Sequence, residues 1–332
     1  MRAMVLRQPA PAASAPLRLE SAVDPAPAAD EVLLRVRACG VCRTDLHLAE
    51  GDLAPHRDRV VPGHQIVGDV IGCGASVSGV GTGMRVGVTW LGGVDGTCSQ
   101  CRAGRENLCD HPVFTGYDRD GGYAEYVTAR ADFVFRIPEQ LDDVHAAPLL
   151  CAGTIGFRSA RVAEVQHGEA IGLYGFGASA HLLLPLLKAW NCRVYVATRG
   201  EPHRELAQQL GADWTGDALD RPPVELDRAI TFAPSGGVVV AALSALRKGG
   251  VVAINAIHLD GMPAFDYDTL LWGERQIRSV ANLTRDDARD FLRLVAQIKL
   301  RPNVETFPLH HANAALVKLK SDALSAAAVI VP

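Results

Sequence analysis

Four residues between positions 95 and 109 have the types and spacing of a zinc site. Cys98, Cys101 and Cys109 form a C-x2-C-x7-C run, and Asp95 precedes this run by three residues. Short loops of this kind let thiolates converge on one tetrahedral Zn²⁺, and a carboxylate oxygen is an acceptable fourth ligand. The alternatives left open are free thiols in a surface loop and a solvated turn at Asp95.

Three further residues are candidate ligands of a second metal, although they lie far apart in the sequence. Cys42 lies in CGVCRTDLH, His64 in PGHQ and Cys151 in PLLCAG. Two thiolates and one imidazole, with the fourth position open, form the ligand set of a catalytic zinc. Spacing alone does not bring the three together, and a lone cysteine such as Cys151 is most often a buried small side chain.

The segment YGFGASA carries a candidate nucleotide site, because Gly175, Gly177 and Ala180 form a G-x-G-x-x-A turn. The turn follows a predicted apolar strand and opens a predicted helix, which is the context that a dinucleotide-binding turn requires. Gly175 would permit the tight turn, Gly177 the approach of a pyrophosphate, and Ala180 close packing of helix on strand. An ordinary glycine-containing turn is the alternative.

The end of the next predicted strand favours NADP over NAD. An NAD site usually places Asp or Glu there, about 20 residues beyond the glycines, to bind the adenosine ribose. This chain has Thr198 and Arg199 instead, and no carboxylate before Glu201. A guanidinium and a hydroxyl suit a ribose 2′-phosphate. Alternatively, Arg199 is a solvated arginine and the protein accepts either cofactor.

The elements that must position these residues change in kind near residue 146. Before it, short apolar or alternating segments broken by glycine predict strands. After it, strands and helices alternate, which predicts a parallel sheet with helices on both faces. The predicted strands are 170–176, 193–198, 227–233, 251–256 and 326–332, and the predicted helices are 146–165, 178–190, 202–211, 238–249 and 285–298.

Length and charge limit the classes of partner. A chain of 332 residues is long enough for about two domains. A net charge of −4 gives no indication of a nucleic-acid partner, and no apolar run has the roughly 18 residues of a membrane span. The opening segment lacks the apolar core and cleavage site of a secretory signal. We therefore expect a cytoplasmic protein, in which the eight cysteines favour metal binding or catalysis over disulfides.

The motifs together resemble the zinc-dependent medium-chain alcohol dehydrogenases over essentially the whole chain. CGVCRTDLH resembles the first-ligand motif, VPGHQIVG the glycine-histidine-glutamate motif, the D-x2-C-x2-C-x7-C run the structural-zinc lobe, and YGFGASAH the nucleotide loop. The resemblance implies an α/β protein with a GroES-like β-rich catalytic domain and a Rossmann doubly wound parallel-sheet domain, and an active site in the cleft between them. The implied bounds are 1–148 together with 287–332 for the catalytic domain and 149–286 for the Rossmann domain. Within the catalytic domain, the structural-zinc lobe would cover about 92–112.

The resemblance also assigns roles to single residues. Thr44 would take the alcohol proton and pass it through the nicotinamide ribose to His47, which would release it to water. Asp45 would orient His64 through the ring nitrogen that is not on zinc. Taken alone, His47 could be a surface histidine and Asp45 a helix cap. The implied zinc ligands are Cys42, His64 and Cys151 in the catalytic site, and Asp95, Cys98, Cys101 and Cys109 in the structural site.

Two residues depart from the family pattern. Gln65 stands where the family usually has Glu after the ligand histidine, which removes a carboxylate able to visit the metal. Asp95 stands where the family usually has the first of four structural cysteines, which predicts a weaker site or an empty lobe.

The substrate pocket is indicated by three residues. Trp90 matches a family position that often lines the pocket, where an indole beside zinc would favour unbranched primary alcohols and aldehydes. It could equally be a core residue. Asn255 and Asn282 lie near predicted strand ends facing the cleft and are candidate contacts to the nicotinamide.

The sequence therefore predicts a zinc- and NADP-dependent alcohol dehydrogenase or aldehyde reductase, and the resemblance implies a homodimer or homotetramer. One alternative is a zinc-free quinone or enoyl reductase of the same superfamily, which the Cys and His ligand set disfavours. The other is a non-catalytic zinc- and nucleotide-binding redox sensor, which would have no need of Thr44 and His47. Three cysteines without an assigned role are predicted to be buried, namely Cys39, Cys73 and Cys192.

Overall fold

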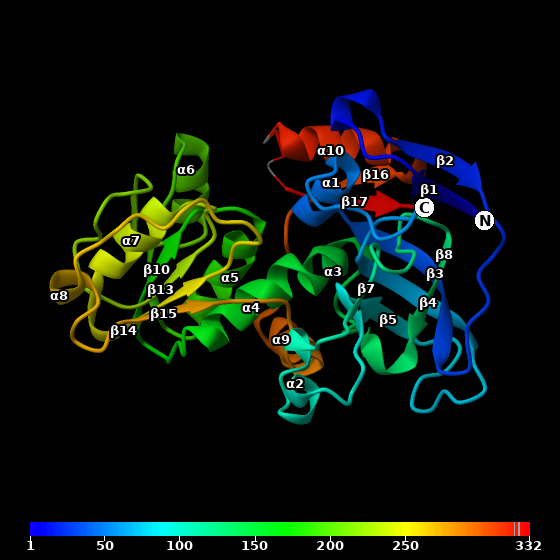
Figure 1. Ribbon diagram of the computed structural model, residues 1–332, viewed down its shortest axis with the longest axis horizontal. Coiled ribbons are helices and arrows are strands. Elements are labelled where there is room, and N and C mark those ends of the chain that lie inside the picture. Colours follow the sequence, from blue (N-terminus) through cyan, green and yellow to red (C-terminus); the bar gives the residue numbers. More distant parts are fainter. Residues whose placement is uncertain (322, 325) are drawn as a thin grey trace. The chain divides into compact units, whose positions relative to one another are not determined.

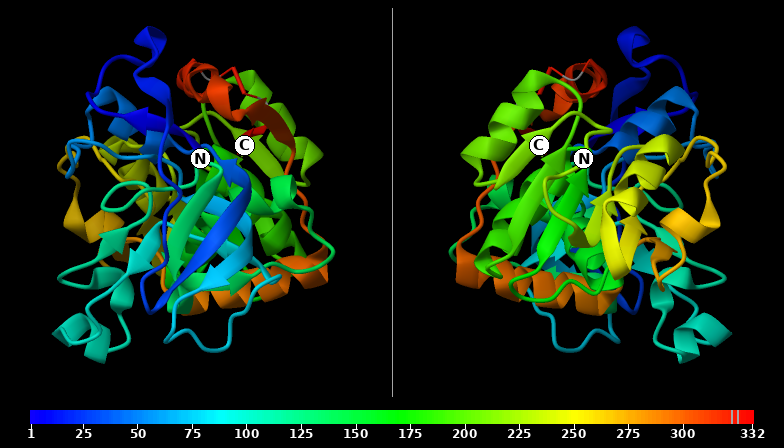
Figure 2. Two further views of the ribbon diagram at one scale, coloured as in Figure 1. Left: turned by 90° about the vertical axis from the view of Figure 1, so that its right-hand side faces the viewer. Right: turned by 90° about the vertical axis from the view of Figure 1, so that its left-hand side faces the viewer.

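The computed structural model describes residues 1–321, 323–324 and 326–332, and the chain divides into two compact units. The first unit consists of Met1–Cys151 and Asn282–Pro332, and the second of Ala152–Ala281. Both ends of the chain therefore belong to the first unit, and they lie near one another in Figures 1 and 2. None of the helices formed by the described residues is long and apolar enough to cross a membrane.

The first unit is built around a sheet with the order β16-β17-β3-β4-β5-β9, in which β8 pairs with the beginning of β3. All of its strand pairs are antiparallel except β16 with β17. The strands are β3 (Glu31–Gly40), β4 (Gln65–Cys73), β5 (Arg85–Val88), β8 (Tyr126–Arg130), β9 (Val134–Arg136), β16 (Val304–Pro308) and β17 (Ala327–Val331). Two separate pairs are β1 (Arg2–Leu6) with β2 (Leu17–Ser21), and β6 (Leu91–Gly93) with β7 (Val113–Phe114).

Helices of the first unit lie between and after these strands. The α-helices are α1 (Arg43–Glu50), α2 (Ser99–Arg102), α3 (Asp143–Ala146), α9 (Arg285–Ile298) and α10 (Ala312–Lys320). Short 3₁₀ turns are η1 (Ala12–Ser14), η2 (Glu106–Leu108), η3 (Ala131–Phe133), η4 (Ala147–Leu150) and η5 (Leu309–His311). The helix predicted over 285–298 is confirmed by α9, which begins in a capping box made by Thr284 and Asp287.

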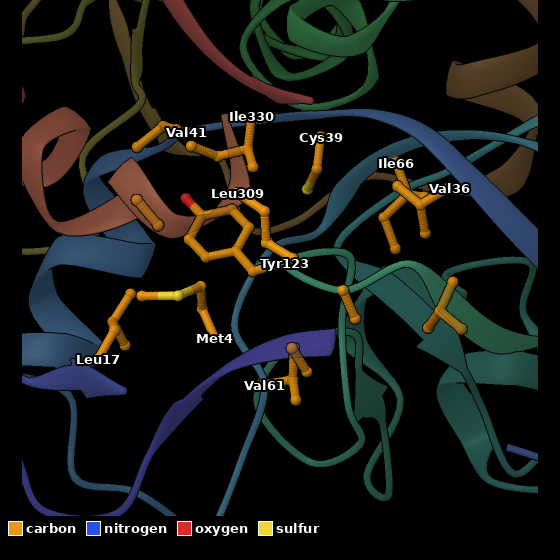
Figure 3. Packing of buried hydrophobic residues seen from close by; sticks show 14 of the residues in the cluster. Met4, Leu17, Val36, Cys39, Val41, Val61, Ile66, Tyr123, Leu309 and Ile330 are labelled. Carbon is orange, nitrogen blue, oxygen red and sulfur yellow. The ribbon is translucent and has the colours of Figure 1, made fainter. Parts of the chain in front are cut away.

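The core of the first unit joins segments from both ends of the chain. Strand β3 alternates, so that Val32, Leu34 and Val36 are buried while the residues between them face outward. Figure 3 shows side chains of this cluster, among them Met4, Leu17 and Tyr123 from the first half of the chain and Leu309 and Ile330 from its end. Burying each such apolar side chain stabilises the fold by about 1.5–3 kcal/mol.

The second unit is a six-stranded parallel sheet with the order β12-β11-β10-β13-β14-β15. Strand β10 pairs with both β11 and β13, so the direction of winding reverses there, which confirms the predicted doubly wound sheet. Figure 1 shows α4 and α5 side by side on one face and α7 on the other. The strands are β10 (Ala170–Tyr174), β11 (Arg193–Ala197), β12 (Trp214–Gly216), β13 (Leu226–Thr231), β14 (Leu246–Ile254) and β15 (Gln276–Ser279), and the helices are α4 (Ala152–Val162), α5 (Ala178–Ala189), α6 (Glu201–Gln209), α7 (Gly236–Ser244) and α8 (Tyr267–Leu270).

Three predictions from the sequence are wrong. The helix predicted over 146–165 is broken, because Ala147–Leu150 form the 3₁₀ turn η4 and Cys151 has φ −129°, so that α4 covers only Ala152–Val162. The helix predicted over 238–249 ends at Ser244, because Leu246 is fully buried and pairs with Leu226 as the first residue of β14. Sheet pairing at this point overrides the helical periodicity of ALSALRKG. Cys39 and Cys192 are buried as predicted, but Cys73 is exposed, because it is the last residue of β4.

The unit boundaries differ by a few residues from the predicted domain bounds. Turn η4 packs on β3 and β4, so the first unit continues through Cys151. Toward the end of the chain Asn282 already belongs to the first unit, and its side-chain amide donates to the carbonyl oxygen of Asn107 at 3.1 Å.

Candidate active site and zinc centres

Paired strands of the first unit end where two of the candidate ligands lie. Strands β3 and β4 place Gly40 opposite Gln65. Cys42 follows Gly40 by two residues and His64 directly precedes Gln65, so both residues lie just beyond the same end of this strand pair. Cys151 follows η4, which packs on these same strands. Strand pairing and the packing of one turn therefore remove the long separation of the three residues in sequence.

The three ligand atoms form a cluster of the size that zinc requires. The Sγ atoms of Cys42 and Cys151 are 4.0 Å apart, and these atoms and a ring nitrogen of His64 all lie within 4.8 Å of one another. Zn–S bonds of about 2.3 Å in a tetrahedral site would hold two sulfurs about 3.8 Å apart. His64 is 0% exposed, and neither of its ring nitrogens has a hydrogen-bond partner among the residues described, although Nδ1 lies 3.3 Å from an oxygen of Asp45. Because a buried nitrogen without a partner is costly, these residues fit a bound Zn²⁺.

The acid–base properties of the ligands follow from their proximity. A hydrogen bond from the Cys151 thiol, helped by His64, holds the pKa of Cys42 well below its usual range. The same contact and burial raise the pKa of Cys151 well above the ordinary value. Burial lowers the pKa of His64, but the Asp45 carboxylate and Cys42 outweigh it and raise that pKa to about 10. Metal binding would therefore displace protons from this cluster.

Asp45 accepts hydrogen bonds from several sides and is only 2% exposed. Its Oδ1 accepts from the backbone N–H of Gly63 at 3.1 Å and lies 3.3 Å from Nδ1 of His64. Its Oδ2 accepts from the backbone N–H of Cys42 at 2.8 Å and from the Tyr123 hydroxyl at 3.3 Å. One carboxylate thus caps α1 and faces the imidazole ring on the side away from Nε2.

Tyr123 and the peptide of Gly63 are functional groups that sequence reasoning missed. Tyr123 is fully buried, lies 78 residues from Asp45 in the chain, and sits in a segment, GGYAEYV, that indicates only a strand. No spacing or motif links it to the ligands. Figure 3 shows the Tyr123 ring inside the hydrophobic core, and its hydroxyl donates to Asp45.

The remaining residues predicted around the catalytic zinc differ in their distance from the ligands and in their exposure to solvent. The Thr44 hydroxyl oxygen is 3.8 Å from Sγ of Cys42. The Trp90 ring meets His64 edge-on, with ring centroids 5.0 Å apart. His47, one turn along α1 from Thr44, is 38% exposed. Gln65 is buried next to His64, so the residue that replaces the family's glutamate is a neutral amide inside the protein.

The second cluster brings together Asp95, Cys98, Cys101 and Cys109, whose ligand atoms also lie within 4.8 Å of one another. Backbone N–H groups donate to these sulfurs, from Cys101 to Cys98 and from Asp95 to Cys109, each at 3.4 Å. The N–H groups of Cys98 and Thr97 donate to Asp95 and hold its carboxyl pKa well below the usual range. An ionised carboxylate beside three sulfurs fits a zinc site of the Asp/Cys₃ type.

Replacing Asp95 should change how firmly this lobe holds zinc. Because thiolate is a softer ligand than carboxylate, Asp95→Cys should slow the loss of one zinc equivalent to a chelator, whereas Asp95→Ala should speed it and lower the melting temperature. Metal analysis after timed dialysis measures this. Asp110→Ala, at an exposed acid outside the cluster, is the matched control. Retention of zinc by Asp95→Ala at the unmodified rate would contradict the assignment.

Two asparagines predicted as nicotinamide contacts are engaged inside their own units. The Asn282 amide donates to Asn107 of the Asp/Cys₃ lobe, and nearby Arg285 pairs with Glu106 at 2.7 Å, so this segment anchors the lobe. The Asn255 amide donates to the Ser159 hydroxyl at 2.9 Å in the second unit. A nicotinamide contact from either side chain would have to share or replace these hydrogen bonds.

The turn between β10 and α5 has the geometry of a phosphate site. Gly175 has φ +86°, and a Cβ there would lie 2.9 Å from the backbone nitrogen of Ala233, so only glycine fits. Gly177 is the N-cap of α5 and has open space where a Cβ would be, while Ala180 is fully buried. With no side chain capping α5, its first N–H groups are available to a phosphate.

Strand β11 ends directly before the residues predicted to select the cofactor. Thr198 is buried, and its hydroxyl donates to the Arg199 carbonyl at 3.5 Å. Arg199 is exposed, and its guanidinium has no hydrogen bond or ion pair within the described part of the chain. Arg204, which sequence reasoning missed, donates to the Thr198 carbonyl at 3.1 Å and pairs with Glu201 at 2.7 Å. Two guanidinium groups therefore lie near the end of β11.

The chain is similar in sequence and in fold to known alcohol dehydrogenases. Residues 28–139 match the family model of the alcohol dehydrogenase GroES-like domain. The protein named "Probable alcohol dehydrogenase AdhA" of Mycobacterium tuberculosis (strain CDC 1551 / Oshkosh) is 47% identical over 99% of this chain and 97% of its own. An alcohol dehydrogenase of Geobacillus stearothermophilus is 34% identical over 90% of this chain and 91% of its own. The structure of a cinnamyl alcohol dehydrogenase from Sorghum bicolor, 26% identical, superposes with a TM-score of 0.89 over 99% of this chain and 97% of that one.

Similarity along nearly the full length of both chains, to relatives named for one activity, confirms the family that the motifs resemble. It also sets aside the non-catalytic sensor and the zinc-free reductase. The chain belongs to the zinc-dependent medium-chain alcohol dehydrogenases, which are NAD(P)-dependent oxidoreductases acting on CH–OH groups.

Proposed function

We propose that this enzyme interconverts primary alcohols and aldehydes with NADP(H), using a zinc ion held by Cys42, His64 and Cys151. The observation that carries this proposal is the convergence of the three ligand atoms within 4.8 Å, with the Trp90 ring against His64. When bound, zinc would supply the Lewis acidity that lowers the pKa of an alcohol hydroxyl, and the nicotinamide would accept a hydride.

The side chains around the cluster would handle the proton. Thr44, with its hydroxyl 3.8 Å from Sγ of Cys42, would accept the alcohol proton, and His47, which reaches solvent, would release it to water. Asp45 holds the His64 ring by its Nδ1 side, which leaves Nε2 for the metal.

The primary-alcohol preference is supported by the packing of Trp90. Its ring stacks on Phe114 with centroids 4.9 Å apart and on Tyr117 with centroids 5.8 Å apart. Aromatic packing of this kind fixes the orientation of the indole, whose edge meets His64. A fixed indole beside the metal leaves less room for a second substituent on the carbinol carbon, as in a secondary alcohol.

The NADP preference is supported by the charges at the end of β11. Arg199 offers an unpaired guanidinium there, and no Asp or Glu stands between Ala197 and Glu201 to bind a ribose hydroxyl pair. Charge-assisted hydrogen bonds from arginine to phosphate are among the stronger polar contacts in proteins.

Turnover with both cofactors tests the proposal. We expect kcat/KM for a straight-chain primary alcohol to be higher with NADP than with NAD, and higher than for its secondary isomer. Arg199→Asp should lower kcat/KM with NADP by about 10- to 100-fold and improve NAD, because it removes a charge-assisted contact and supplies a ribose acceptor. Absorbance of the reduced nicotinamide is the measurement.

Arg193→Asp is the matched control, since Arg193 is an exposed arginine at the opposite end of the same strand. It should leave the ratio of the two cofactors unchanged. A higher kcat/KM with NAD in the unmodified enzyme would overturn the cofactor assignment, and a higher value with the secondary alcohol would overturn the substrate class.

We also propose that the enzyme acts in the cytoplasm as a homodimer or homotetramer. The free edge strand β15 and the exposed rings of Tyr267 and Trp272 in the same unit support self-association, because large exposed aromatic side chains commonly mark protein interfaces. Analytical ultracentrifugation measures the assembly.

A further inference from the structure

We propose that Asp52 is a positioning residue for proton release: its carboxylate holds Nδ1 of His47, so that Nε2 is the nitrogen that takes up the substrate proton. This inference rests on the proposed role of His47 and adds a residue that no motif contains. It concerns the ring nitrogens and their protons, and it requires no contact between Asp52 and the metal or the substrate.

The contact is built by the way α1 ends. Oδ2 of Asp52 lies 3.0 Å from Nδ1 of His47. The backbone N–H groups of Gly51 and Leu53 both donate to the carbonyl oxygen of His47, at 3.0 and 3.1 Å. Gly51 has φ +91°, a left-handed conformation that favours glycine, and it turns the chain back at the end of the helix. Asp52 stands between the two residues that bind this carbonyl, so the backbone itself brings its carboxylate to the imidazole.

The chemistry of the pair then determines which nitrogen reacts. A neutral imidazole carries one N–H donor and one acceptor nitrogen, whereas an ionised carboxylate can only accept. Nδ1 must therefore hold the hydrogen, and Nε2 must hold the lone pair. During alcohol oxidation Nε2 would gain one proton and form an imidazolium beside Asp52. Loss of that same proton from Nε2 to water restores the starting tautomer, and the hydrogen on Nδ1 stays in place throughout.

The other charged groups near His47 have contacts with residues other than His47, or lie elsewhere on the packed helices. Arg43 lies one turn earlier on the same face of α1, and it has contacts of its own. Glu50 pairs with Lys320 of α10 at 2.7 Å and accepts from the Ala12 N–H. The other titratable groups on α1, or on and next to the helix α10 that packs against it, are Asp45, Lys318, His310 and His311. Lys318 pairs with Glu305. Within the described residues, Asp52 is the carboxylate that pairs with His47.

The test reads the tautomer directly. In the zinc-loaded enzyme labelled with ¹³C and ¹⁵N histidine, the His47 ring signals should show hydrogen on Nδ1, and His47→Gln assigns them by their loss. Asp52→Ala should move these signals toward the tautomer with hydrogen on Nε2. It should also lower kcat for alcohol oxidation by roughly two- to five-fold without changing KM, the size expected for a largely exposed pair. Asp52→Asn should retain much of the wild-type signal, since a carboxamide oxygen still accepts from Nδ1–H.

The controls separate this inference from the proposed function. Asp58→Ala, at another exposed acid in the loop that follows α1, should change neither the His47 ring signals nor kcat. If His47→Gln leaves kcat unchanged, the proposed role of His47 fails. If His47→Gln slows turnover but Asp52→Ala changes neither the ring signals nor kcat, the inference about Asp52 alone is overturned. In the His47→Gln background Asp52→Ala should have no further effect, and a further loss there would also overturn it.

Discussion

Replacing Cys42 with alanine should lower kcat/KM for alcohol oxidation by at least about 10³-fold while the protein remains folded. Stabilisation of developing negative charge by a metal ion is worth several kcal/mol, and each 1.36 kcal/mol corresponds to a factor of ten in rate. His64 and Cys151 alone would leave zinc with two protein ligands, too few to hold it in a tetrahedral site. Turnover, zinc content and circular dichroism measured on the same preparation check this expectation.

Cys39→Ala is the control for the loss of a thiol from the same segment. Cys39 is fully buried in the core (Figure 3), three residues before Cys42, and is not part of the metal cluster. Its replacement should cost some stability through a small cavity but leave turnover and zinc content near those of the unmodified enzyme. Wild-type turnover by Cys42→Ala would show that the catalytic centre lies elsewhere.

The second large effect is expected for Asp45→Asn, although the side chain keeps its shape. The groups facing Asp45 are the N–H groups of Cys42 and Gly63, the Tyr123 hydroxyl and the His64 ring. A carboxylate accepts at both oxygens, whereas an amide must point its NH₂ group at donors on one side. We expect a loss of about 3–5 kcal/mol in the free energy of unfolding and a 10- to 100-fold weaker affinity for the catalytic zinc.

Two variants calibrate this effect. Tyr123→Phe removes one of these donors, at 3.3 Å, and should cost about 0.5–1.5 kcal/mol of stability. Asp69→Asn makes the same chemical change in a partly exposed carboxylate that pairs with Arg37, and it should cost less than about 1 kcal/mol. Denaturant unfolding measures the free energy of unfolding, and competition with a zinc chelator measures the zinc affinity. An Asp45→Asn protein as stable as Asp69→Asn would contradict the role given to this carboxylate.

Structural features that depend on one short segment could be predicted from the sequence, because the residues that determine them are neighbours in the chain. The sequence predicts the helix 285–298 with the bounds that α9 has, since a capping box of Thr284 and Asp287 begins the helix and apolar residues recur along it about every 3.6 residues. The Asp/Cys₃ cluster is likewise predictable, because a loop of fifteen residues suffices to bring Asp95 and Cys109 together. The turn at Gly175 follows from the strand, the glycines and the helix that surround it.

Elements that depend on distant partners could not be predicted in this way. The segment 246–249 has a helical pattern, but Leu246 belongs to β14, because pairing with Leu226 and burial favour the strand. The pairing of Asp52 with His47 escaped sequence reasoning for a related reason. Their spacing is short, but the contact depends on how the turn at Gly51 bends the chain after α1.

By itself, the sequence determined the types of the candidate zinc ligands, the two kinds of domain, and, through the resemblance, the family. The tertiary structure alone decided how the candidate catalytic ligands meet: β3 pairs with β4, η4 packs on both, and Cys42, His64 and Cys151 converge. It alone placed Tyr123 and the Gly63 peptide against Asp45. The physical reason is that the chemical nature of a ligand is a property of one residue, whereas its position and its hydrogen-bond partners come from segments brought together only by burial of a common core.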